Sequence, residues 1–152
     1  MFETPVTIVG NVIDPPKHRR LPSGASVTNF RVASTARKFD RTREEWVDGD
    51  SLFVRVTCWR QLADNTIRSV FQGDPVIVTG RLCTKDYEVD GQRRSSFELD
   101  AQAVGPNLAR GLSEFTRNRS VASLTTTDLE ELAAAASARE REPELAGVGS
   151  DT

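Results

Sequence analysis

Residues 52–59 read LFVRVTCW, and this stretch decides both the fold and the surface that the chain presents. In an extended strand, successive side chains point to opposite faces. One face is apolar, as expected for a strand that covers a core, and consists of Leu52, Val54, Val56 and Cys58. The other face places two aromatic rings around a cation and a hydroxyl: Phe53, Arg55, Thr57 and Trp59. Because exposed aromatic rings usually mark an interaction surface, the second face suits a flat, stacking ligand such as the bases of a single-stranded nucleic acid.

The neighbouring segments predict a small barrel. Apolar and alternating runs predict four further strands, at Val6–Val12, about Ser26–Ala36, Pro75–Lys85 and about Ser95–Val104. Residues 60–72 have apolar side chains at helical spacing before Gly73, which predicts one helix. Asp90-Gly91 is a hairpin signal between the last two strands. Three strands, one helix and two strands predict an all-β chain with the five-stranded OB-fold layout. A small mixed sheet made from the same elements is the alternative.

The same patterns predict the core and the state of the cysteines. Phe30, Phe71 and Phe97 fall on core-side alternations or on the helix, so we expect them to be buried. Cys58 and Cys83 are far apart in the sequence and each lies in an apolar run, which predicts two buried, reduced thiols and neither a disulfide nor a metal site.

Charge divides the chain into two parts. Residues 1–120 hold 18 Lys and Arg against 15 Asp and Glu, a net charge of +3, whereas residues 121–152 hold 2 against 7, a net charge of −5. We therefore expect a mildly basic domain over residues 1–112 and a flexible acidic tail over residues 113–152, with a short helix at 127–141. The stretch Arg37–Asp50 is so highly charged that we expect a mobile loop there.

Candidate ligand contacts occupy the strands and loops that OB-folds use for binding. The aromatic side chains that we expect to stack on bases are Phe39, Trp46, Phe53, Trp59 and Tyr87. The cations that we expect to contact phosphates are Lys17, Arg19, Arg20, Arg31, Arg37, Lys38, Arg55, Arg81, Lys85, Arg93 and Arg94. His18, beside two arginines, is expected to contact phosphate or solvent.

Several other classes of protein are disfavoured. There is no phosphate-binding loop, no nucleophile elbow, no Cys-x-x-Cys and no pair of histidines, so catalysis is not expected. The acidic cluster Glu44, Glu45, Asp48 and Asp50 is expected to be a solvated loop, and we expect neither a metal nor a cofactor. With no spanning apolar run and no signal segment, a cytoplasmic location is expected.

The ordered motifs resemble the bacterial single-stranded DNA-binding protein (SSB) family. The resemblance rests on residues 7–11, Asp14-Pro15, residues 22–24, residues 29–34, the strand with Phe53 and Trp59, and residues 73–82. It covers about residues 4–110 and implies an OB domain that forms a homotetramer and binds single-stranded DNA without sequence preference, in replication, recombination or repair. Among the stacking candidates, it assigns that role to Phe39 or its neighbour, Phe53, Trp59 and Tyr87.

The end of the chain departs from the family pattern, in which a long linker leads to an acidic peptide with a hydrophobic tip that recruits partner proteins. Residues 147–152 read GVGSDT and carry no such tip, so the chain resembles a shorter, secondary paralogue. Recruitment of a partner protein through the tail is then an open question. Two alternatives to DNA binding remain: an interaction module whose aromatic face makes subunit or partner contacts, and binding of RNA.

Overall fold

The structure is a computed structural model, and it describes residues 2–118 and 126–140. The chain divides into two units, Met1–Ser113 and Glu114–Thr152, which we describe separately. Among the described residues, no helix is long and apolar enough to cross a membrane.

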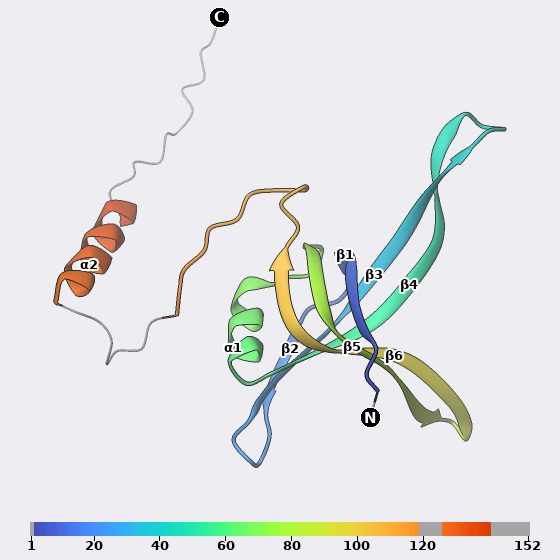
Figure 1. The fold of residues 1–152 in the computed structure, drawn as a ribbon, viewed down its shortest axis with the longest axis horizontal. Coiled ribbons are helices and arrows are strands. Elements are labelled where there is room, and N and C mark those ends of the chain that lie inside the picture. The colour runs from blue at the N-terminus through green and yellow to red at the C-terminus, as the bar shows by residue number, and fades with distance from the viewer. Residues whose placement is uncertain (1, 119–125, 141–152) are drawn as a thin grey trace, which may run out of the picture. The chain divides into compact units, whose positions relative to one another are not determined.

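The first unit is a six-stranded sheet in which five strands close into a barrel and the short second strand extends the edge of the third (Figure 1). Its elements are β1 (Pro5–Val12), β2 (Lys17–Arg20), β3 (Ser26–Asp40), β4 (Glu45–Trp59), α1 (Arg60–Ser69), β5 (Pro75–Val89) and β6 (Gln92–Pro106). Neighbouring strands follow the order β1-β5-β6-β4-β3, and β1 also pairs with β3, which closes the ring. The β4–β6 pair is parallel and the other pairs are antiparallel. The predicted OB-fold, with its helix between the third and fourth barrel strands, is confirmed.

Two glycines permit the close crossings that the barrel needs. A Cβ added at Gly10 would collide with the carbonyl oxygen of Ala33 where β1 meets β3. A Cβ at Gly80 would collide with the carbonyl oxygen of Asp100, at an irregularity where β5 passes β6. Because backbone lies in both positions, neither site has room for a side chain.

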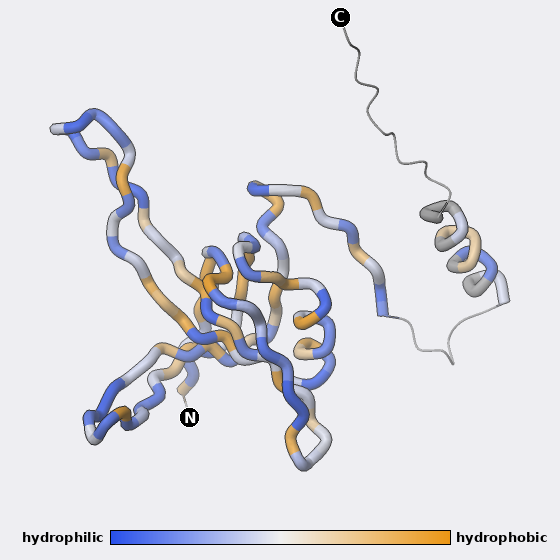
Figure 2. Tube along the Cα trace, turned by 180° about the vertical axis from the view of Figure 1, so that it is seen from behind, coloured by the Kyte–Doolittle hydropathy of each residue, from blue (hydrophilic) through white to orange (hydrophobic). Residues whose placement is uncertain are grey.

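The core lies inside the barrel, under α1. It is built from one alternating face of each strand except β2, and it includes Ile8, Val12, Phe30, Val32, Val54, Val56, Cys58, Val76, Val78 and Leu99. The helix contributes buried Ala63 and Thr66, and Thr28 Oγ1 donates a hydrogen bond to the Ala63 carbonyl oxygen at 2.9 Å. In Figure 2 the apolar positions gather in the barrel strands, while the end of the β3–β4 hairpin is hydrophilic.

Phe30 and Cys58 are buried as predicted, but four apolar side chains expected in the core are exposed. Phe71 is exposed because α1 ends at Ser69 and the helical spacing no longer applies. Leu52 and Phe97 have core-side alternation but lie where the hairpins leave the barrel, so no core covers them. Cys83 is exposed because it follows Leu82, which packs on the core, and therefore points outward.

Two charged segments form strands that the sequence did not predict. The charged stretch Arg37–Asp50 forms the end of a long β3–β4 hairpin that projects from the barrel, with a turn at residues 41–44 (Figure 1). The basic segment Lys17–Arg20 is β2, which pairs with residues 26–29 of β3. The predicted hairpin at Asp90-Gly91 is confirmed, with φ of 52° and 76° at the two turn residues.

In the second unit, α2 spans Thr126–Glu140, where a helix was expected at 127–141. Arg141 and the rest of the predicted tail beyond it lie outside the described residues.

Candidate nucleic-acid interface

A single surface of the barrel gathers most of the candidate residues. Residues directly opposite each other on paired strands present their side chains on the same side of the sheet. We call the side turned away from the core the outer face; it is built by β2, β3, β4, β6 and β5. One row across it consists of Lys17, Asn29, Thr57, Asp100 and Arg81. The next row consists of Arg31, Arg55, Glu98 and Cys83.

The aromatic candidates of β4 lie on the outer face as the alternation predicts. Phe53 is 57% exposed and Trp59 is 42% exposed, whereas their neighbours Val54 and Cys58 are buried. Arg55 lies between the two rings along the strand and is also exposed. The outer side of β4 therefore has two solvent-exposed aromatic rings, one on each side of an exposed arginine.

A β-bulge brings Trp46 to the same face. Ser51 lies opposite Thr35, but Asp48 lies opposite Arg37, so three residues of β4 span two residues of β3. An extra residue in one strand reverses which side chains face outward beyond it. Without it, Trp46 would share the side of Val54 and Val56. With it, Trp46 lies opposite Phe39 on the outer face, and the two rings make an edge contact with centroids 5.7 Å apart.

The fifth aromatic candidate comes from the other long hairpin. Tyr87 of β5 is exposed and lies opposite Arg94 of β6, two residues beyond the pair formed by Lys85 and Ser96. Cys83 and Glu98 come next along the same alternation. Tyr87, Lys85 and Arg94 thus continue the outer face along the β5–β6 hairpin.

The eleven predicted phosphate contacts do not all share this face. Eight do: Lys17, Arg19, Arg31, Arg37, Arg55, Arg81, Lys85 and Arg94. Three others point to the opposite side of their strands. Arg20 lies opposite Ser26, Lys38 opposite Val47 and Arg93 opposite Glu88. His18 shares the side of Arg20, where its Nε2 lies 3.1 Å from Asp64 Oδ1 of α1.

Several outer-face arginines are already paired with carboxylates. Arg31 pairs with Asp14, Arg37 with Asp48, and Arg55 with Glu98. Arg81 pairs with both Glu3 and Asp100. Two further cross-strand pairs of β3 and β4 are neutral and hydrogen-bonded. Thr57 Oγ1 donates to Asn29 Oδ1 at 2.9 Å, and the hydroxyl oxygens of Thr35 and Ser51 are 2.8 Å apart. The outer face therefore combines aromatic rings and neutral polar side chains with arginines whose charges are partly offset by neighbouring carboxylates.

Two carboxylates around this site have lowered pKa values. Burial alone would raise the pKa of Asp14, but hydrogen bonds from the Arg31 side chain and backbone outweigh it and hold the pKa below 3.8. A hydrogen bond from Ser26 and the neighbouring His18 lower the pKa of Asp64. Both groups are therefore ionised near neutral pH.

Sequence reasoning missed the carboxylates that accompany the arginines. Glu98 and Asp100 alternate in the predicted last strand, and this alternation could have placed them on the outer side. Asp14 gives no such signal, because it lies outside the predicted strands, directly before Pro15 and Pro16. Among the described residues, no group of His, Cys, Asp and Glu is arranged to hold a metal ion.

A closed OB barrel with exposed aromatic rings and cations on one face is typical of a class of protein, the single-stranded nucleic-acid-binding OB-folds. The profile of the Single-strand binding protein family matches residues 4–106, about two thirds of the chain. The chain belongs to that family.

Relatives and solved structures agree with this assignment. The chain is 47% identical over 116 residues to the single-stranded DNA-binding protein of Corynebacterium glutamicum, covering 76% of this chain and 52% of that one. It is 47% identical over 116 residues to single-stranded DNA-binding protein 2 of Streptomyces coelicolor, covering 76% and 58%. The chain thus spans little more than half the length of these relatives.

Two solved structures are similar to this chain. The small single-stranded DNA-binding protein of Streptomyces coelicolor aligns with a TM-score of 0.68 at 45% identity, over 73% of this chain and 100% of that one. The second single-stranded DNA-binding protein of Mycobacterium smegmatis aligns with a TM-score of 0.62 at 38% identity, over 76% and 100%.

Proposed function

We propose that this protein binds single-stranded DNA on the outer face, without sequence preference, by stacking bases on aromatic rings and pairing phosphates with cations. The observation that carries the proposal is the gathering of five exposed aromatic side chains and eight cations on one side of an OB barrel. Each base stacked on an aromatic ring contributes about 1–3 kcal/mol regardless of its identity. The names of the relatives, all single-stranded DNA-binding proteins, support the same ligand.

The proposed site consists of the candidates that share the outer face. The stacking residues are Phe39, Trp46, Phe53, Trp59 and Tyr87, and the principal phosphate contacts are Lys17, Arg19, Arg31, Arg55, Lys85 and Arg94. We leave out Arg20, Lys38 and Arg93 because they lie on the other side of their strands. Arg37 and Arg81 are treated as secondary because neighbouring acceptors already occupy both of their terminal nitrogens.

Membership of the family supports a proposal for the wider biological role. The protein acts without catalysis, as a cytoplasmic protein that protects single strands during replication, recombination or repair. Support for a binding protein rather than an enzyme comes from membership of the family.

The first unit is proposed to assemble as a homotetramer. Val9 of β1 and Ile77 of β5 lie directly opposite each other and are both exposed, next to the hydrogen-bonded pair Thr7 and Thr79. This apolar strip lies at the β1–β5 side of the barrel, apart from the aromatic rings of β3 and β4. Subunit contacts there would leave the outer face open to DNA. Light scattering should then give a mass four times that of one chain.

The proposed domain division assigns DNA binding to residues 1–112 and leaves residues 113–152 as a separate acidic tail that contacts a protein partner or competes weakly with DNA. The support is the net charge of −5 over residues 121–152. Truncation after residue 120 should raise DNA affinity at low salt if the tail competes, and unchanged affinity would remove that role.

Tryptophan fluorescence during titration with oligo-dT tests the proposal, because Trp46 and Trp59 both lie on the outer face. Stacking should quench the emission, and phosphate contact should make the affinity fall as salt is raised. A titration with neither quenching nor salt dependence would reject both parts of the mechanism.

The alternative is an interaction module, since exposed aromatic side chains are also typical of protein interfaces. It predicts that Phe53→Ala and Trp59→Ala change the oligomeric mass while DNA binding is weak throughout. A second comparison uses RNA and DNA oligonucleotides of equal length and sequence. If RNA binds more tightly than DNA, the ligand of the outer face would be RNA instead of DNA.

A further inference from the structure

Two arginines face each other across β3 and β4 in an arrangement that needs an explanation. Arg31 lies directly opposite Arg55, so their Cβ atoms are only about 5 Å apart. Like charges directly opposite each other on a sheet are destabilising. The outer face nevertheless places them side by side at its centre, with Phe53 next along β4.

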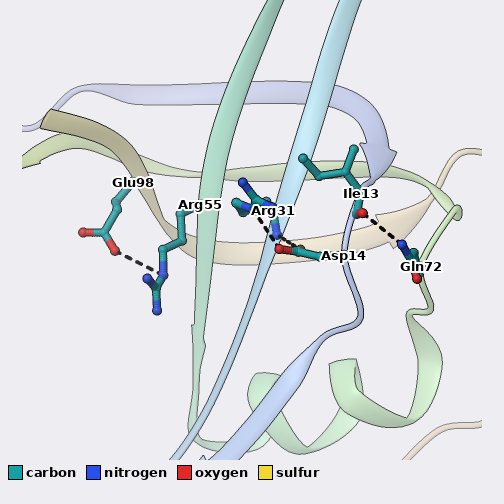
Figure 3. A network of polar contacts seen from close by, with 6 residues as sticks. All are labelled: Ile13, Asp14, Arg31, Arg55, Gln72 and Glu98. Carbon is teal, nitrogen blue, oxygen red and sulfur yellow. Dashed lines mark hydrogen bonds and ion pairs between the residues drawn. The ribbon is translucent and has the colours of Figure 1, made fainter. Parts of the chain in front are cut away.

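Each arginine has a carboxylate of its own: Asp14 accepts hydrogen bonds from Arg31, whereas Glu98 forms a longer ion pair with Arg55 (Figure 3). Asp14, in the segment after β1, accepts a hydrogen bond from Arg31 Nε at 2.7 Å and another from the Arg31 backbone N–H at 2.8 Å. Glu98, on β6, lies 3.7 Å from Arg55 Nε and is largely buried. The two carboxylates therefore flank the pair and offset the repulsion.

The nitrogens used in these contacts separate this pair from the other arginines of the face. Arg31 and Arg55 are approached at Nε, and their terminal nitrogens make no hydrogen bond with any residue that the structure describes. In contrast, the two terminal nitrogens of Arg81 each donate a hydrogen bond, one to Glu3 at 2.7 Å and the other to Asp100 at 2.6 Å. The two terminal nitrogens of Arg37 likewise donate hydrogen bonds within the β3–β4 hairpin, to the Asp48 carboxylate and the Trp46 carbonyl oxygen.

The segment that carries Asp14 is fixed by backbone contacts. The Ile13 N–H donates to the Arg31 carbonyl oxygen at 3.0 Å, and the Gln72 side chain donates to the Ile13 carbonyl oxygen at 3.0 Å (Figure 3). Asp14 is thus tied to β3 and to the turn after α1. A guanidinium held at Nε by a fixed carboxylate keeps its orientation while its terminal N–H groups stay available to a phosphate.

We propose that Asp14 and Glu98 are positioning residues that hold Arg31 and Arg55 by Nε and so preset a two-arginine site for a backbone phosphate of the bound strand. The inference rests on the proposed function. It goes beyond it by assigning a supporting role to two acidic residues that, by charge alone, should oppose the binding of a polyanion.

The sign of one mutational effect tests the proposal. Asp14→Asn removes a negative charge from a surface that binds a polyanion, so electrostatics alone predicts tighter binding. Positioning predicts the opposite: affinity for fluorescein-labelled oligo-dT, measured by anisotropy with the full chain, should fall about three- to tenfold. Glu98→Gln should shift the affinity in the same direction but by less, because its contact is longer.

Two controls separate positioning from simple destabilisation. Asp48→Asn removes a carboxylate of the same face that binds a terminal nitrogen, and it should leave affinity unchanged or raise it. In the Arg31→Lys background, Asp14→Asn should have little further effect, because the group through which it acts is gone. The plot of log affinity against log salt should also lose about 0.7 in slope for one lost phosphate contact in Asp14→Asn, a change that partial unfolding does not produce.

The outcomes are distinguishable. If the wild type binds oligo-dT and Asp14→Asn binds equally well or more tightly, the proposed function stands and the positioning role is overturned. The same conclusion follows if Asp14→Asn is as harmful in the Arg31→Lys background as alone. If the wild type does not bind single-stranded DNA in any salt, the proposed function fails, and the positioning role fails with it.

Discussion

The two sides of the β4–β6 sheet show how one set of strands serves two purposes. On the inner side, Val56 and Leu99 are completely buried and hold the barrel together. On the outer side, Arg55 and Glu98 occupy the adjacent positions and form an ion pair between an exposed arginine and a largely buried carboxylate. The alternation of strand side chains therefore separates stability from binding, residue by residue. Mutations on the two sides should affect different measurements.

The largest effect is expected from the inner side. Leu99→Ala should lower the free energy of unfolding by about 2–5 kcal/mol, because it removes a fully buried side chain and leaves a cavity. Urea unfolding followed by circular dichroism measures it. The matched outer variant, Phe53→Ala, should change the free energy of unfolding by less than about 0.5 kcal/mol. Equal losses of unfolding free energy in the two variants would mean that the outer side stabilises the fold as much as the inner side does.

The next effect concerns binding. Trp59→Ala should weaken oligo-dT binding by about 1–3 kcal/mol, which is about 5- to 150-fold, through loss of one stacked base. Anisotropy titrations give the affinity, and thermal melting serves as the control for folding. If both Trp59→Ala and Phe53→Ala bind like the wild type across a salt series, the stacking assignment is wrong.

A smaller effect distinguishes two lysines on long hairpins. Lys85 lies on the outer face and Lys38 on the opposite side of its strand, and both are exposed. Lys85→Ala should reduce the salt slope of DNA binding by about 0.7, the value for one phosphate on a single strand. Lys38→Ala should leave the slope nearly unchanged. A reversal of these two results would show that the strand follows the other side of the hairpins.

The smallest effect is the pH dependence of the Asp14–Arg31 pair. The pKa of Asp14 is lowered below 3.8 in the folded protein, so the pair stabilises the fold fully above the ordinary aspartate pKa. This contribution is lost only as the pH falls through the lowered value. The difference in unfolding free energy between wild type and Asp14→Asn should therefore be constant from pH 7 to about pH 5 and shrink in stronger acid. A difference that already declines near pH 6 would contradict it.

The sequence predicted the barrel well because strand alternation and the Asp90-Gly91 turn are local signals. It also placed Phe53 and Trp59 correctly, since alternation alone decides their side of β4. It could not predict that the charged stretch Arg37–Asp50 is a hairpin, because pairing with a neighbouring strand, rather than local propensity, orders it. The bulge that turns Trp46 outward is likewise a property of register, which depends on two strands at once.

The residues whose burial or pairing the sequence did not predict share a cause. Phe97 and Leu52 obey the alternation of core residues, but the alternation gives no information about where a hairpin leaves the barrel. The pairing of Arg31 with Asp14 joins residues that are 17 apart in the sequence and depends on how the segment after β1 packs against β3. Such contacts require the closed barrel before they can be seen.

The most direct test of the outer face uses the two cysteines as internal reporters. Cys83 lies in the row of Arg55 and Glu98 on the outer face, whereas Cys58 is fully buried in the core, where burial raises the pKa of its thiol to about 11. Alkylation of the native protein at neutral pH, followed by mass spectrometry, should modify Cys83 and spare Cys58. Saturating oligo-dT should protect Cys83. An unchanged rate of Cys83 modification while DNA is bound would contradict the claim that the strand lies across this face.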